Sequence, residues 1–89
     1  MISRTTSKFW KAYDRLDEQT KEQARASYKL FGADPQHPSL QFKKVHAKKP
    51  IYSARINIDY RVVGILEENE IIWFWIGPHN DYEKLLPRL

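Results

Sequence analysis

Four side chains in the second half of the chain have the chemistry to bind a phosphate and move a proton. Arg55 and Arg61 are permanently charged, and a guanidinium can hold two phosphate oxygens through parallel hydrogen bonds. His79 can give or accept a proton at neutral pH. Tyr82, three residues later, would share a helical face with His79. These four residues are therefore the candidate catalytic site.

Each of these side chains also has an ordinary structural explanation. Arg55 and Arg61 could be solvated or salt-bridged residues of strands, and His79 follows a Gly-Pro pair, where a capping or surface histidine is common. Tyr82 could stack on a base, orient a phosphate or anchor the end of the chain. The residue types alone leave these alternatives open.

The positive charge is concentrated around the two arginines. Residues 41–61 hold six Lys or Arg and a single acidic residue, Asp59, so the net charge of this segment is +5. The net charge of the whole chain is +4, so the other residues together carry −1. Such a patch is typical of a domain that binds a polyanion or an acidic protein, although a solvated lysine-rich loop has the same composition. The candidate RNA-binding residues of this segment are Lys43, Lys44, Lys48 and Lys49. His46 lies among them with nothing to mark it above a surface histidine.

The length and composition predict one small domain over residues 1–89. The chain has no cysteine, so neither disulfides nor a thiolate zinc site can hold it together, and a reducing cytoplasm suits it. The longest apolar run, residues 71–77, is much shorter than the roughly 20 residues of a membrane span, and we expect no signal peptide. The predicted protein is cytoplasmic and makes no membrane contact.

The first third of the chain has the pattern of a helical hairpin. Apolar residues recur at helical spacing from Phe9 to Leu16, after three possible capping residues at 5–7, which predicts a first helix. Asp17 precedes a polar turn with acidic residues, which predicts the start of a second helix. Gly32 is placed to end the second helix in a left-handed conformation. The expected buried stripe of the second helix is Ala24, Tyr28 and Phe31.

The rest of the chain has the pattern of strands. We expect a first strand over residues 40–44, a half-buried one over 51–58 with Arg55 on its open face, and two more over 60–66 and 71–76. Residues 79–86 could add a short C-terminal helix that Pro87 ends. The predicted fold is α+β, with a helical hairpin packed on a mainly antiparallel sheet of about four strands.

Two tryptophans stand at alternate positions of the last predicted strand. Trp73 and Trp75 should therefore face the same side, with Phe74 on the other. Exposed aromatic residues beside a basic patch can stack on bases, but a pair on a central strand is typical of the core. We expect both tryptophans to pack against the helices.

The order and spacing of several short motifs resemble the RelE/ParE superfamily of bacterial toxins. The match covers residues 51–86. Members of the superfamily carry an arginine in the strand that follows a basic loop, a Tyr-Arg or similar pair at the next strand, and an Ile-Gly-x-His-x-x-Tyr motif in the tail. The motifs are Ser53-Ala54-Arg55-Ile56, Asp59-Tyr60-Arg61-Val62-Val63, Ile72-Trp73 and Ile76-Gly77-Pro78-His79-Asn80-Asp81-Tyr82.

The resemblance implies the toxin of a type II toxin–antitoxin pair, with a cognate antitoxin as partner and operator DNA bound only through that antitoxin. RelE-like members cleave messenger RNA on the ribosome, whereas ParE-like members poison DNA gyrase by binding it. Cleavage without metal or cofactor needs a base, a cation for the developing phosphorane charge and an acid. Arg55 and Arg61 fit the cationic role. The glutamate that some nucleolytic members use as base has no counterpart in the basic loop, which weakens a direct transfer of their mechanism.

Three functions are therefore in competition. The first is a ribosome-dependent endoribonuclease with Arg55, Arg61, His79 and Tyr82 as its site. The second is a gyrase poison, in which His79 should be dispensable. The third is an inactive member that binds an antitoxin and little else.

Overall fold

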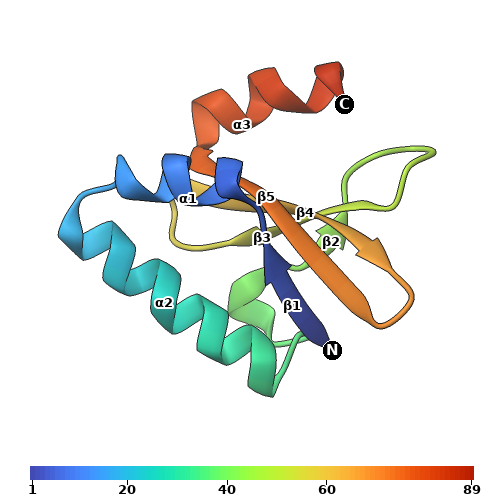
Figure 1. Ribbon diagram of the computed structural model, residues 1–89, viewed down its shortest axis with the longest axis horizontal. Coiled ribbons are helices and arrows are strands. Elements are labelled where there is room, and N and C mark those ends of the chain that lie inside the picture. The colour runs from blue at the N-terminus through green and yellow to red at the C-terminus, as the bar shows by residue number, and fades with distance from the viewer.

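A computed structural model describes all residues, 1–89, and its fold is α+β (Figure 1). A five-stranded sheet has the strand order β1-β5-β4-β3-β2. Helices α1 and α2 cover one face of the sheet, and α3 lies on the opposite side. The elements are β1 (Ile2–Thr5), α1 (Ser7–Asp14), α2 (Glu18–Ala33), a 3-10 turn (Pro38–Leu40), β2 (Lys43–Lys44), β3 (Ile51–Arg55), β4 (Tyr60–Glu67), β5 (Glu70–Pro78), α3 (His79–Leu85) and a second 3-10 turn (Leu86–Arg88). No helix is long and apolar enough to cross a membrane.

The prediction of about four strands missed β1. This strand pairs in parallel with β5, with Ile2 opposite Glu70 and Thr5 opposite Trp73, while the other strands pair antiparallel. Its four residues show no clear alternation, and their partners are far away along the chain. The capping role expected within residues 5–7 belongs to Thr6, whose Oγ1 accepts a hydrogen bond from the Phe9 backbone N–H at 3.1 Å.

The predicted start of the second helix is confirmed, but its predicted end is wrong. The Asp17 carboxylate accepts a hydrogen bond from the Thr20 N–H at 2.8 Å and caps α2. At the other end no glycine has a positive φ, and α2 continues through Gly32 to Ala33. Because Pro35 disfavours helical backbone at the residue before it, Asp34 becomes extended and ends the helix.

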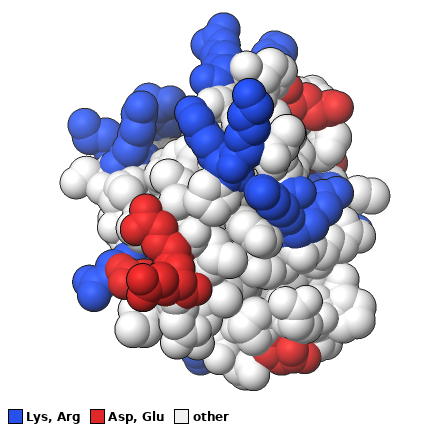
Figure 2. Space-filling model, turned by 90° about the vertical axis from the view of Figure 1, so that its right-hand side faces the viewer, with Lys and Arg blue, Asp and Glu red and all other residues white.

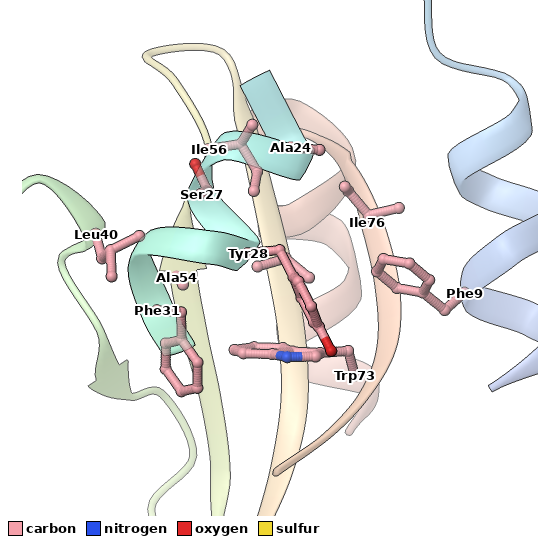
Figure 3. A pocket seen from close by; sticks show the side chains of 11 residues that line it. Phe9, Ala24, Ser27, Tyr28, Phe31, Leu40, Ala54, Ile56, Trp73 and Ile76 are labelled. Carbon is pink, nitrogen blue, oxygen red and sulfur yellow. The ribbon is translucent and has the colours of Figure 1, made fainter. Parts of the chain in front are cut away.

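The main core lies between the two N-terminal helices and the sheet. Phe31 of α2 meets Trp73 of β5 edge to face, with ring centroids 5.3 Å apart. Figure 3 shows these rings around a small cavity of about 40 Å³. Tyr28 was predicted in the buried stripe, but 52% of it is exposed. The buried residues of this core are Phe9, Ala24, Phe31, Leu40, Ala54, Val62, Ile71, Trp73 and Ile76.

A smaller core lies on the other face of the sheet, beneath α3. Ile51 of β3, Val63 of β4 and Tyr82 of α3 are its buried members, and Leu85 and Leu86 pack beside them. The predicted C-terminal helix is therefore confirmed. The face of β3 that was expected to be open is in part covered by α3.

Two predicted strand ranges are too long. Leu40 is buried in a 3-10 turn, and Gln41 has a left-handed φ of 45°, so the first strand is reduced to Lys43–Lys44. Strand β3 ends at Arg55 because residues 56–59 form the turn into β4. Ile58, which was expected inside, is 72% exposed.

A β-bulge overturns the expected placement of the tryptophans. Val63 of β4 pairs with Trp75, but its neighbour Gly64 pairs with Trp73, so Phe74 is an extra residue in β5. The extra residue shifts the alternation of side chains by one position. Trp73 therefore packs in the main core, whereas Trp75 packs with Tyr82 on the α3 face.

Candidate functional site

The two candidate arginines lie side by side on neighbouring strands. Arg55 is the last residue of β3, and its partner in the antiparallel register is Arg61 of β4. Because Ser53, two residues before Arg55, contacts α3, the alternation of β3 places Arg55 and Arg61 on the α3 face. Both side chains are partly exposed, and neither forms an ion pair.

Arg61 also holds the turn between β3 and β4. Its Nη1 donates to the backbone oxygens of Asn57 at 2.7 Å and of Tyr60 at 3.0 Å. The Asn57 side chain closes the same turn, because its Oδ1 accepts from the N–H groups of Asp59 and Tyr60. The Arg61 side chain thus stabilises the turn, whereas the Arg55 side chain has no hydrogen bond within the protein.

His79 is the first residue of α3 and lies at the same end of the sheet. Its backbone N–H donates to the Asp59 oxygen at 2.7 Å, which joins the start of α3 to the turn that Arg61 holds. Its Nδ1 is 3.4 Å from Oε1 of Glu83, and its side chain is 41% exposed. The imidazole is therefore partly open to solvent, at the end of the sheet where the strand register places Arg55 and Arg61. Nε2 is its nitrogen without a partner in the protein.

Tyr82 is buried and works as an anchor in this structure. Only 7% of the residue is exposed, and its hydroxyl donates to Oγ of the buried Ser53 at 3.0 Å. The Tyr82 ring also lies 5.6 Å from the ring of His79 and 6.4 Å from that of Trp75. Of the roles considered for Tyr82, the anchoring of the tail is the one that this geometry supports.

The four candidate lysines are divided among different environments. Lys43 pairs with Ser53 and so lies on the α3 face, while Lys44 pairs with Tyr52 and points to the opposite face. The Lys49 ammonium donates to the Leu89 oxygen at 2.7 Å and ties its loop to the tail. The Lys48 side chain is exposed and has no hydrogen bond or ion pair.

The basic surface extends along the side of the molecule that carries α3. Figure 2 shows Lys and Arg side chains gathered in the upper half of one face, the half on which α3 lies in Figure 1, with acidic side chains in smaller separate groups. His46 contributes to the shape of the loop here, because its Nδ1 accepts from the backbone N–H groups of Lys48 and Lys49. That structural role fits the expectation of an unremarkable histidine.

Three residues of this region escaped the sequence reasoning. Ser53 was taken for a polar residue on an open face, and its burial follows only from the position of α3. Trp75 was assigned to the wrong face because a bulge leaves no clear mark in the sequence. Glu83 could have been found, since it stands four residues after His79 on the same helix.

The site combines cationic groups with one solvent-open imidazole. A phosphate that binds Arg55 would lie beside Arg61 and near the start of α3, where His79 can exchange a proton. No three His, Cys, Asp or Glu side chains lie together in a way that could hold a metal ion. The chemistry that these residues can support is acid–base chemistry on a bound phosphate.

A second hollow lies on the helical side of the molecule. It has a volume of about 440 Å³ and is bordered by α1, α2 and the outer strand β1. Trp10 and Tyr28, about half exposed, line it together with Tyr13, Arg25 and Lys29. Its lining contains two cations and no acidic side chain, which suits an acidic partner with apolar side chains.

Comparison with known proteins places this fold and these motifs in one family. The chain is similar to the toxin in the RelB-RelE complex of Methanococcus jannaschii, with a TM-score of 0.75, 12% identity and coverage of 92% of this chain and 96% of that one. It is also similar to YafQ of E. coli strain BL21(DE3), with a TM-score of 0.73 and 12% identity, and the match covers 90% of this chain and 94% of that one.

A third similar structure is that of the YoeB-YefM toxin-antitoxin complex of Staphylococcus aureus, with a TM-score of 0.67, 17% identity and coverage of 89% and 97%. No curated protein sequence matches the chain significantly. The model of the ParE-like toxin domain matches residues 18–84, which include α2, the candidate site and most of α3. The resemblance found in the sequence is thereby confirmed: this chain belongs to the ParE-like toxin domain family of the RelE/ParE superfamily.

Proposed function

We propose that this chain is the toxin of a type II toxin–antitoxin pair and cleaves messenger RNA on the ribosome. The observation that carries the proposal is the Arg55–Arg61 pair. Like charges at directly opposed strand positions destabilise a sheet, and here no carboxylate compensates them. A pair of residues that lowers the stability of the fold is expected at a functional site, here one that binds a ligand of opposite charge. A phosphate is the ligand that two adjacent guanidiniums fit.

In the proposed reaction the 2′-hydroxyl of a ribose loses its proton to a water molecule, and its oxygen bonds to phosphorus while the bond from phosphorus to O5′ breaks. The products are a 2′,3′-cyclic phosphate and a 5′-hydroxyl. Arg55 binds the phosphate and stabilises its developing charge, and Arg61 holds the turn and adds its own positive charge. His79 protonates the leaving O5′ through Nε2. Tyr82 positions His79 by anchoring α3 on β3.

The lysines contribute to binding rather than to the bond-breaking step. Lys43 is on the same face as Arg55 and is placed to bind the neighbouring phosphate, while Lys44 and Lys48 add exposed positive charge. Each such contact strengthens binding by counterion release, so binding should weaken steeply as salt increases. Lys49 acts on the tail more than on RNA because its ammonium already has a partner.

The test is cell-free translation with the purified chain, followed by mapping of new messenger RNA 5′ ends by primer extension. Arg55→Gln is the sharpest variant because the Arg55 side chain makes no hydrogen bond or ion pair within the protein. Arg15→Gln is the matched control, since Arg15 is exposed at the end of α1. In-frame cuts made by the wild type and the control but lost in Arg55→Gln and His79→Ala support the proposal. Intact RNA with all four proteins contradicts it.

Gyrase is the alternative target, and the same set of variants separates the two. If cells that express the chain stop growing while their messenger RNA stays whole, inhibition of purified gyrase becomes the assay. A gyrase poison acts by binding alone, so His79→Ala should then remain toxic. A chain that causes no arrest without its antitoxin would be an inactive, antitoxin-binding member.

The proposed partner is a cognate antitoxin. Two of the similar structures are complexes of a toxin with RelB or YefM, which supports a partner of this kind for the chain. The hollow beside Trp10 and Tyr28 is the surface that we expect the antitoxin to cover. The test is co-purification of the chain with the product of an adjoining gene. The complex should be lost in the double variant Trp10→Ala/Tyr28→Ala. Retention of the complex in that double variant would rule out this surface.

A further inference from the structure

The bulge in β5 moves one tryptophan onto the face that carries the arginines. Trp73 pairs with Gly64 and packs on Phe31 in the main core, whereas Trp75 pairs with Val63 on the α3 face. β-bulges often re-aim a side chain beside an active site. In a regular strand without the bulge, Trp75 would lie on the same face as Trp73 and point into the helix-covered core. The bulge therefore brings a large aromatic ring to the candidate site.

The indole of Trp75 lies over Gly77, close to Arg61. A Cβ at Gly77 would lie 2.7 Å from Cζ2 and 2.9 Å from Cη2 of Trp75, so only glycine leaves room for the ring. Gly77 is the register partner of Arg61. The six-membered ring of the indole is thus directed toward the end of the sheet where Arg55, Arg61 and the start of α3 meet.

Three aromatic rings follow one another at this end. Trp75 lies 6.4 Å from Tyr82, and Tyr82 lies 5.6 Å from His79. Tyr82 is buried, whereas Trp75 is only partly buried, so part of its ring is open to solvent. A glycine within a strand often marks a place where a ligand or another group approaches closely, so the packing of α3 alone would not require a tryptophan over Gly77. Aromatic rings beside cations are the usual means of binding single-stranded nucleic acid, because every base has a face on which to stack.

We propose that Trp75 is the stacking platform for the nucleobase next to the phosphate that Arg55 binds. This inference rests on the proposed function, since it assigns the base-binding part of the same site. The ligand is a base of single-stranded RNA, and the contact is independent of base identity. Trp75 binds and positions the RNA, while proton transfer stays with His79.

The first experiment compares cleavage by the wild type, Trp75→Leu and Trp75→Phe at limiting concentrations of programmed ribosomes. Leucine keeps an apolar contact with α3 but removes the stacking surface, so cleavage should fall roughly tenfold, whereas phenylalanine should keep it within about threefold. Circular dichroism identifies the folded variants. Arg15→Gln, exposed at the end of α1, is again the control. A folded Trp75→Leu that cuts at the wild-type rate overturns the inference and leaves the nuclease proposal intact.

A second experiment needs neither catalysis nor a variant that folds. The wild type is titrated with a 2′-O-methyl RNA trinucleotide, which cannot be cleaved because it has no free 2′-hydroxyl. The indole N–H signals of the three tryptophans are followed by NMR. The Trp75 signal should move, and that of the buried Trp73 should not. Movement of the Trp75 signal supports stacking even if no cleavage is found, and a Trp75 signal that stays in place contradicts it.

Discussion

The Tyr82 hydroxyl and the Ser53 hydroxyl form the one buried side-chain hydrogen bond between α3 and the sheet, 3.0 Å long. Both residues are less than 10% exposed, at 7% and 2%. Together with the bond from the His79 N–H to the Asp59 oxygen, this bond helps to fix the position of α3 on the sheet. A polar pair inside an apolar cluster gives this helix a single register, which apolar packing alone would specify less well.

Tyr82→Phe should lower the free energy of unfolding by about 1–2 kcal/mol, because Ser53 is left buried without its donor. Ser53→Ala should cost a similar amount, and the double variant should cost less than the sum of the two. Urea denaturation of the four proteins measures this cycle. Tyr28→Phe is the control, since Tyr28 is half exposed and its hydroxyl has no partner. Strict additivity would show that the two hydroxyls do not interact.

Gly64→Ala and Gly32→Ala should have opposite effects on stability. A Cβ at Gly64 would lie 2.7 Å from the Trp73 ring and 2.9 Å from the backbone oxygen of Ile72, and the backbone cannot give way without disturbing the bulge. We expect a loss of about 1–3 kcal/mol. Gly32 is in α2 with nothing within 4 Å of its Cβ position, so alanine should stabilise by about 0.5–1 kcal/mol. Thermal unfolding of both variants tests the pair.

Much of the fold could be predicted because the signals are local. The capping role of Asp17, the two-residue turn between β4 and β5 and the apolar face of α3 depend on residues within a few positions of one another. The residues of β1 and the bulge could not be found in this way. Strand β1 has its partner at the other end of the chain, and a bulge changes side-chain alternation without changing composition.

The candidate site shows the same division. Arg55, Arg61 and His79 were found from residue type and spacing, and the structure brings them to one end of the sheet. The burial of Tyr82 and the carbonyl contacts of Arg61 depend on how α3 and the turn at 56–59 fold back, which no local pattern contains. Spacing could thus identify the candidate residues, but only tertiary contacts separate the side chains that are free to bind a ligand from those that already have partners in the protein.

Asp17 should make stability depend on pH at the acid end. Hydrogen bonds from the side chain and backbone of Thr20 lower the pKa of Asp17 below its ordinary value of 3.8. A carboxyl whose pKa is lower in the folded state contributes stability that is fully present well above pH 3.8 and is lost as pH falls through the folded value. Melting temperatures from pH 6 to pH 2 should therefore fall more for the wild type than for Asp17→Ala. Parallel curves would mean that the cap does not respond to protonation.

Arg55→Gln should separate stability from activity. The substitution removes one of two like charges at opposed strand positions, so the protein should become more stable, by up to roughly 1 kcal/mol, while RNA cleavage is lost. The gain should shrink in high salt, which screens the repulsion between partly exposed charges. Arg15→Gln, exposed at the C-cap of α1, should change neither property. A less stable Arg55→Gln would show that Arg55 supports the sheet, and the argument from uncompensated charge would then lose its basis.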